Sequence, residues 1–181
     1  MPYVESFEPW VGRDPVVLIL GSMPGVASLQ QQRYYAHPRN AFWPILGELF
    51  GIDWSEDYAR RREQFEALPL ALWDVLQGCE REGSLDAAID PRSLRINRLP
   101  ELLRELPGIE RILFNGATAE RLFKRHVLPQ LEGERTPLLL RLPSTSPAHA
   151  GMGFEEKRSR WGEALAPAFI YAAGASNISE S

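Results

Sequence analysis

The sequence has a single cysteine, Cys79, among its 181 residues, so no disulfide can form within the chain. Histidine is also scarce, and His37, His126 and His149 show neither HxH nor HxxxH spacing. Zinc sites and iron–sulfur clusters need grouped Cys or His ligands. We therefore expect no metal in this protein.

Long hydrophobic runs are absent as well. No segment approaches the 18 consecutive apolar residues of a membrane-spanning helix, and the first residues, MPYVESFEPWVGRDP, lack the basic and apolar regions of a secretory signal. The sequence thus predicts a cytoplasmic protein without membrane contact. The net charge of −4 provides no general attraction for nucleic acid, although a few basic side chains can still contact phosphates locally.

Three common catalytic signatures are missing. Neither GxGxxG nor GxxxxGK[ST] occurs, which argues against a dinucleotide or nucleotide triphosphate site. GxSxG is absent too, so a serine hydrolase is not indicated. The hydrophobic fraction of 44% and charged fraction of 24% are ordinary for a globular protein. We expect one domain over residues 1–175 and a frayed, flexible tail over 176–181.

Apolar runs and helical periodicities alternate along the chain. Buried strands are predicted at residues 15–21, 111–116 and 136–143, with a strand or buried turn at 70–76. Helices are predicted from residue 42 and at residues 55–69, 97–106, 117–131 and 154–172. Ser55 is expected to cap the second helix, and residues 77–89 to form a polar loop. This alternation predicts a three-layer α/β/α domain with a central, mainly parallel sheet.

In such a sheet the ligand site lies beyond the carboxyl ends of the strands. Two unusual loops follow predicted strands there, GSMPG at residues 21–25 and LPSTSPAHA at residues 142–150. A third unusual stretch, YYAHPRNAFW at residues 34–43, follows the first loop. It contains two tyrosines, a histidine and an asparagine in a segment interrupted by proline. Backbone N–H groups of GSMPG can bind an oxyanion or a ring carbonyl, although a tight structural turn explains the motif equally well.

GSMPG, YYAHPRNAFWPIL and LPSTSPAHA together resemble the uracil-DNA glycosylase superfamily, above all its hypoxanthine-DNA (deoxyinosine) glycosylases and the related mismatch-specific branch. The resemblance spans residues 15–165 and implies a uracil-DNA-glycosylase-like fold. It also implies a base-binding role for the first loop, whose residues are Gly21, Ser22, Met23, Pro24 and Gly25.

Met23 stands where most of the superfamily has an Asn, Asp or Glu that handles the catalytic water. Because a thioether cannot take a proton, another polar residue must act. Asn40 resembles the asparagine assigned this role in hypoxanthine-DNA glycosylases, and its carbonyl oxygen can orient a water. The alternative for Asn40 is a cap of the helix that follows.

The resemblance also assigns base-binding residues. Tyr35 matches the aromatic residue that stacks on the extruded base, while Tyr34 is more readily a core residue. His37 is suited to donate to a phosphate or the base, or it braces its loop. Asp74 and residues 79–86 fall where relatives read the base, and Asp74 can accept from N1–H of hypoxanthine or cap a turn. Asn115 is expected only to close a turn, outside the site.

The second motif is expected to contact DNA. By resemblance, its hydroxyl residues bind phosphate and the next residues approach the space that the flipped nucleotide leaves. The residues concerned are Ser144, Thr145, Ser146, Pro147, Ala148 and His149. Pro147 and Ala148 are too small to fill the space left by the flipped nucleotide. Either His149 fills it, or the enzyme favours damaged or weakly paired bases, which leave the helix at low energetic cost. An ordinary proline-bearing loop is the alternative.

These features predict a monofunctional DNA glycosylase that flips a deaminated base, most readily hypoxanthine, and hydrolyses its N-glycosidic bond. No lysine lies in the motifs, so no Schiff-base step is expected, and the hydrolysis needs no cofactor. The expected partner is DNA containing the damaged base, bound by a monomer. Uracil is the nearest alternative substrate. A catalytically silent DNA-binding module and a small-molecule nucleosidase are two further alternatives.

Overall fold

The structure is a computed structural model that describes residues 1–178. Its strands are β1 (Tyr3–Glu5), β2 (Trp10–Val11), β3 (Val17–Gly21), β4 (Leu70–Asp74), β5 (Leu76–Glu80), β6 (Arg95–Ile96), β7 (Arg111–Asn115) and β8 (Leu138–Leu142). Its helices are α1 (Val26–Gln31), α2 (Phe42–Phe50), α3 (Tyr58–Glu66), α4 (Leu99–Glu105), α5 (Ala117–His126), α6 (Phe154–Ala164) and α7 (Ala166–Ile178), with 3₁₀ turns η1 (Asp86–Ala88) and η2 (Leu128–Leu131).

A five-stranded sheet in the order β2-β4-β3-β7-β8 forms the centre of the molecule. Strands β4, β3, β7 and β8 are parallel, and β2 pairs antiparallel with β4 at one edge. This confirms the mainly parallel sheet. A second, antiparallel sheet in the order β1-β5-β6 was not predicted. Its central strand β5 covers part of residues 77–89, so the prediction of a loop there was wrong for that part.

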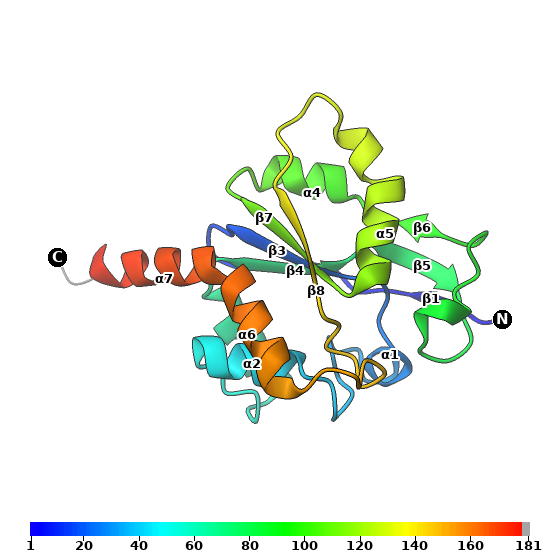
Figure 1. Cartoon of the computed structure of the whole chain (residues 1–181), viewed down its shortest axis with the longest axis horizontal. Coiled ribbons are helices and arrows are strands. Elements are labelled where there is room, and N and C mark those ends of the chain that lie inside the picture. Colours follow the sequence, from blue (N-terminus) through cyan, green and yellow to red (C-terminus); the bar gives the residue numbers. More distant parts are fainter. Residues whose placement is uncertain (179–181) are drawn as a thin grey trace.

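Helices cover both faces of the central sheet, as Figure 1 shows. Side chains alternate along β3, so Val17 and Ile19 pack on one face and Leu18 and Leu20 on the other. The first face packs against α2, α3 and α6, and the second against α4 and α5. All four side chains are fully buried, which explains why β3 reads as one continuous apolar run. The three-layer α/β/α class is confirmed.

Several helix boundaries differ from the predictions, and α1 was not predicted. Asp57 caps α3, because its carboxylate accepts from the N–H of Arg60 at 2.9 Å. Ser55 instead bonds to Asp53, so its predicted capping role was wrong. The final helix is divided into α6 and α7 at Leu165, next to Pro167, which has no N–H to continue the α6 ladder.

The C-terminal helix projects from the side of the molecule in Figure 1. It continues through residues 176–178, which the sequence analysis assigned to the tail, and residues 179–181 lie outside the described residues. None of the described helices is long and apolar enough to cross a membrane.

Candidate active site

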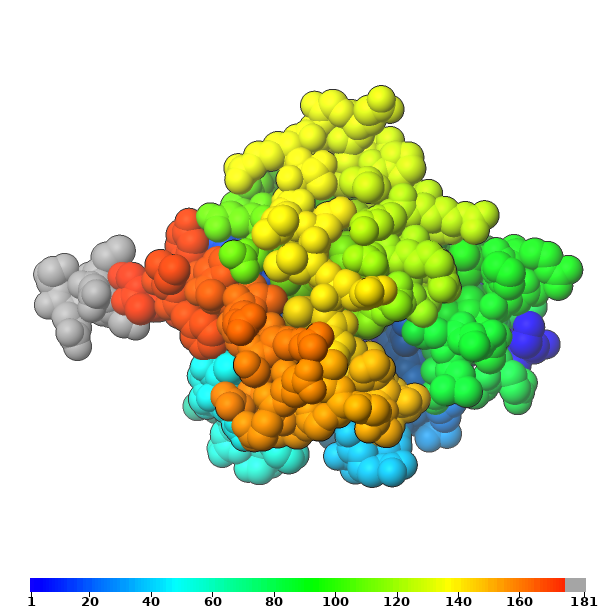
Figure 2. Space-filling view, viewed as in Figure 1, coloured from blue at the N-terminus to red at the C-terminus, as the bar shows by residue number. Residues whose placement is uncertain are grey.

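A pocket of about 340 Å³ opens beyond the carboxyl ends of β3, β4 and β7. Figure 2 shows the hollow between the yellow to orange segment around residues 145–155 and the green segment around 80–90, with blue atoms at its base. All the residues predicted for the site line it, namely Gly21, Ser22, Met23, Pro24, Gly25, Tyr35, His37, Asn40, Asp74, Ser144, Thr145, Ser146, Pro147, Ala148 and His149. The volume is at the lower end of the range of about 300–1,000 Å³ for small-ligand pockets.

Two carbonyl groups of the first loop are bonded to the residues that follow β4. The carbonyl of Gly21 accepts from Val75 N–H at 2.8 Å, and that of Ser22 accepts from Leu76 N–H at 3.1 Å. In a trans peptide the next N–H points the opposite way, so the N–H groups of Ser22 and Met23 point away from β4. Ser22 and Met23 both line the pocket.

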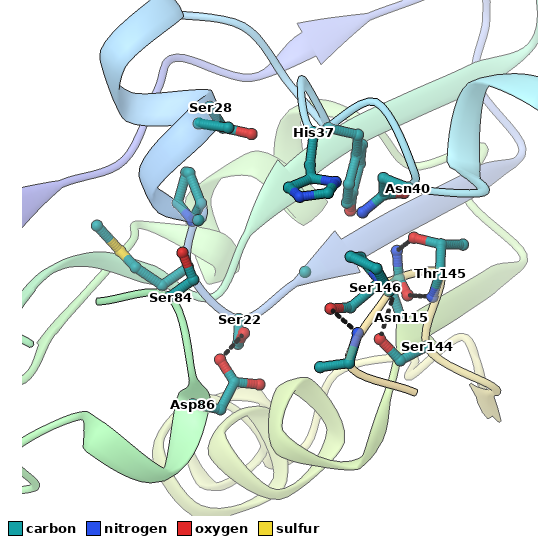
Figure 3. A pocket seen from close by; sticks show the side chains of 18 of the residues that line it. Ser22, Ser28, His37, Asn40, Ser84, Asp86, Asn115, Ser144, Thr145 and Ser146 are labelled. Atoms are coloured by element: carbon teal, nitrogen blue, oxygen red, sulfur yellow. Dashed lines mark hydrogen bonds between the residues drawn. The ribbon is translucent and has the colours of Figure 1, made fainter. Parts of the chain in front are cut away.

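Two side chains from the segment after β5 fix this loop. Arg81 is only 1% exposed, and its guanidinium donates to the carbonyl of Pro24. Asp86 accepts from the hydroxyl of Ser22 at 2.8 Å (Figure 3). The same peptide geometry turns the N–H of Gly25 away from Arg81. The loop is thus held in one shape before any ligand binds.

Tyr35 forms part of the pocket wall, with its hydroxyl directed inward. One face of its ring stacks on Phe42, with centroids 4.0 Å apart and planes at 27°. Its hydroxyl is buried without a hydrogen-bond partner in the described structure. A side chain at Gly21 would collide with Asp74 and approach this hydroxyl to 3.1 Å, so the wall needs glycine there. Burial, and then the Asp74 carboxylate, raise the pKa of Tyr35, while the nearby side chain of Asn115 opposes this.

Asp74 lies at the end of β4 and is only 4% exposed. Its Oδ2 has no hydrogen-bond partner among the described residues. The N–H groups that follow it, of Val75 and Leu76, bond to carbonyls of the first loop instead, so they are not capped by Asp74. Burial, and then the carboxylate of Asp86, raise the pKa of Asp74 to about 7, while Arg81 opposes this. Near neutral pH this carboxyl is therefore poised to donate or to accept a hydrogen bond.

His37 and Asn40 belong to the turn before α2. His37 Nδ1 accepts from the N–H of Arg39 at 3.1 Å, so in the neutral ring the proton is on Nε2. Asn40 Oδ1 accepts from the N–H of Phe42 at 2.9 Å. The capping alternative for Asn40 is therefore present in the structure, although Ala41 occupies the N-cap position of α2. The carbonyl oxygen keeps one lone pair, and Figure 3 places the amide nitrogen toward the pocket.

Thr145 joins three segments of the site. Its N–H and hydroxyl both bond to the side-chain amide of Asn115 at 2.9 Å (Figure 3), and its carbonyl accepts from Ala41 N–H at 3.0 Å. Thr145 is 1% exposed, whereas Ser144 and Ser146 are partly exposed. Thr145 thus holds the second motif in place, and the neighbouring serines are the accessible hydroxyls.

The tip of the second motif is anchored from α6. Lys157 is 5% exposed, and its ammonium donates to the carbonyl of His149 at 2.8 Å. Burial lowers the pKa of Lys157. Ala148 and His149 themselves are exposed at the rim. The anchored rim thus presents these two residues to a ligand outside the pocket.

Other lining residues were not predicted individually. They include Asn115, which the sequence analysis left outside the site, and Ser28, Ser84, Leu85 and Asp86. Asp86 and its neighbours belong to residues 79–86, which the resemblance placed near the base without singling out any one of them. The position of Asn115 at the end of β7 was the available signal, because the ends of adjacent parallel strands meet at one edge.

A three-layer α/β domain with a base-sized pocket and polar loops at the carboxyl edge of its sheet has the features of an enzyme for a small planar group. Residues 9–168 match the family model for the uracil DNA glycosylase superfamily. The chain belongs to this superfamily.

Two curated relatives and a solved structure illustrate what the chain is similar to. It is 33% identical over 162 residues to a hypoxanthine DNA glycosylase of Methanosarcina barkeri, covering 89% of this chain and 97% of that protein. It is 32% identical over 142 residues to a hypoxanthine DNA glycosylase of Methanosarcina acetivorans, covering 78% and 74%. A solution NMR structure from M. acetivorans, described as a candidate uracil DNA glycosylase, superposes with a TM-score of 0.72 at 28% identity, covering 90% and 98%.

Proposed function

We propose that this protein is a monofunctional DNA glycosylase of base-excision repair that removes hypoxanthine from DNA. The observation that carries the proposal is the meeting of the two motif loops and Asn40 around one pocket of about 340 Å³. The names of the curated relatives support the choice of hypoxanthine. We also propose that the protein is a monomer and that it is cytoplasmic.

The pocket accommodates an extruded purine between complementary groups. The ring of Tyr35, backed by Phe42, offers a stacking surface worth about 1–3 kcal/mol per base. Hypoxanthine presents a donor at N1 and an acceptor at O6. The carboxyl of Asp74, whose pKa is about 7, accepts from the first when ionised and donates to the second when protonated. Ser144 and Ser146 bind phosphates beside the flipped nucleotide.

Hydrolysis breaks the bond between C1′ of the sugar and N9 of the base. A water adds to C1′ and loses its proton to solvent, while the base leaves as an anion and is then protonated. Asn40 orients the water through its side-chain amide, whose nitrogen faces the pocket, and the bond from Phe42 N–H to Oδ1 keeps this amide fixed. The N–H groups of Ser22 and Met23 stabilise the charge on the base. No lysine lines the pocket in the described structure, which agrees with hydrolysis without a Schiff base.

Uracil is the second candidate substrate, and the family match favours it. Against it, Met23 lines the pocket where a polar residue handles water in uracil-cleaving relatives, and it is 7% exposed. A thioether cannot serve as a base or hold a water firmly. We therefore place uracil activity well below that on hypoxanthine.

Single-turnover cleavage of duplexes that carry hypoxanthine, uracil or xanthine tests the proposal. Asn40→Ala removes both the water contact and the capping bond, so Asn40→Ser serves as the matched variant, because serine also caps helices. We expect hypoxanthine to give alkali-sensitive product with wild type and neither variant to cleave. Cleavage by Asn40→Ser alone would reduce Asn40 to a cap. A wild type that binds DNA and cuts none of the three duplexes would support a silent binding module.

A further inference from the structure

A large apolar side chain stands exposed at the mouth of the pocket. Leu85 is 60% exposed and lines the pocket, between the end of β5 and η1. An exposed leucine gains stabilisation only when a partner covers it. Leu138 is similarly exposed, at 53%, but lies at the start of β8 and does not line the pocket. Val26 also lines the pocket but is less exposed, at 37%, and has a shorter side chain than Leu85.

The two neighbours of Leu85 are both fixed to the first loop of the site. The hydroxyl of Ser84 accepts from Val26 N–H at 2.9 Å, and the carboxylate of Asp86 accepts from the hydroxyl of Ser22 at 2.8 Å. These bonds hold the backbone on each side of Leu85. The leucine is therefore a pre-organised protrusion, which lowers the entropy lost when it contacts a partner.

The two walls of the pocket differ chemically. Figure 3 shows Ser84 and Asp86 on the side opposite Ser144 and Ser146. The wall formed by Ser84 and Asp86 does not favour phosphate, because the nearby Glu82 is exposed and negatively charged and Arg81 is buried. Hydroxyls line the second wall. A DNA strand therefore fits with its phosphates along the second motif and its stacked bases toward Leu85.

A flipped nucleotide leaves a gap in the base stack. Proteins that unstack DNA insert apolar side chains such as leucine between base steps. The second motif offers only Pro147, Ala148 and His149 at its tip, and the first two are small. We infer that Leu85 enters the gap vacated by the extruded nucleotide, in place of a residue from the second motif. The inference rests on the proposed glycosylase function.

Comparison of double-stranded and single-stranded substrates tests this role. A wedge is needed only where a base must leave a stack, so Leu85→Ala is expected to slow single-turnover cleavage of hypoxanthine in duplex DNA at least about tenfold. Its rate on the same single-stranded oligonucleotide should stay within about twofold of wild type, since no stack is opened. Leu85→Met, which keeps a long apolar side chain, should retain most of the duplex rate. Leu138→Ala is the matched control and should change neither rate.

A second readout reports unstacking directly. With 2-aminopurine next to the lesion, the rise in fluorescence on binding should be smaller for Leu85→Ala than for wild type. Equal loss on both substrates would make Leu85 an ordinary pocket residue and overturn the inference, as would an unchanged duplex rate. If His149→Ala slows cleavage of duplex DNA and Leu85→Ala does not, the residue that fills the gap belongs to the second motif and the inference is wrong. If wild type cleaves neither substrate, the proposed function fails, and this inference with it.

Discussion

The buried carboxyl of Asp74 leads to a prediction about stability that is independent of activity. The native protein holds this proton far more tightly than the unfolded chain, because the pKa is about 7 in the fold and 3.8 as a model value. The fold therefore loses stability as the pH rises from about 4 to 7 and no further above that. By linkage, a pKa shift of this size lowers the free energy of unfolding by about 4 kcal/mol at pH 8 relative to acidic pH. About 3 kcal/mol of this loss occurs between pH 5 and pH 8.

Asp74→Asn removes the titrating group and keeps a donor and an acceptor of similar shape. Urea denaturation at pH 5 and pH 8 should show the variant gaining about 3 kcal/mol on wild type between the two conditions. Asp14→Asn is the matched control, because Asp14 is exposed and has φ of 43°, which asparagine tolerates. A stability difference that is the same at both pH values would refute this account of the carboxyl. Wild-type cleavage should also decline above pH 7 if the protonated carboxyl binds the base, whereas Asp74→Asn stays active.

Three further predictions concern the walls of the pocket. Asn115→Ala should cost about 2 kcal/mol, because it leaves the N–H and hydroxyl of Thr145 unpaired, and a double-mutant cycle with Thr145→Val should show strong coupling in urea denaturation. Tyr35→Phe removes a buried hydroxyl with no partner at hydrogen-bond distance, so thermal unfolding should show equal or higher stability, and a clear loss would mean that the nearby Asn115 side chain satisfies this hydroxyl. Lys157→Met should raise the Kd for lesion DNA severalfold by releasing the carbonyl of His149, with Lys157→Arg closer to wild type.

The central sheet could be predicted because its signals are local. The run at residues 15–21 is buried on both faces and reads as one apolar block, which is a strong signal in a parallel sheet. The antiparallel sheet could not be predicted in the same way. Strands β1 and β6 have three and two residues, too few for any periodicity, and β5 contains a glycine and polar residues. Their pairing is stabilised by contacts distant in sequence.

The site shows the same division. Asn40, Tyr35 and His37 could be proposed because they belong to one recognisable stretch, and the structure places all three in the lining of one pocket. Side-chain pairs across long separations were invisible, such as Ser22 with Asp86, 64 residues apart. Asn115 looked like a turn residue because its partner, Thr145, is 30 residues away. A sequence motif identifies a loop, but the structure is needed to identify what holds that loop in place.

The bond between Ala41 and Thr145 uses only backbone atoms, the N–H of one and the carbonyl of the other. Any residue except proline at position 41 can make it. This bond links the stretch that carries Tyr35 to the second motif. Side chains in either segment can therefore change during evolution while the two segments stay connected. An engineer can vary residues around the pocket to seek a different damaged base while this bond is kept. Asn115 is the exception, because it holds Thr145 through its side-chain amide. A substitution there would remove both bonds, so Asn115 should be kept.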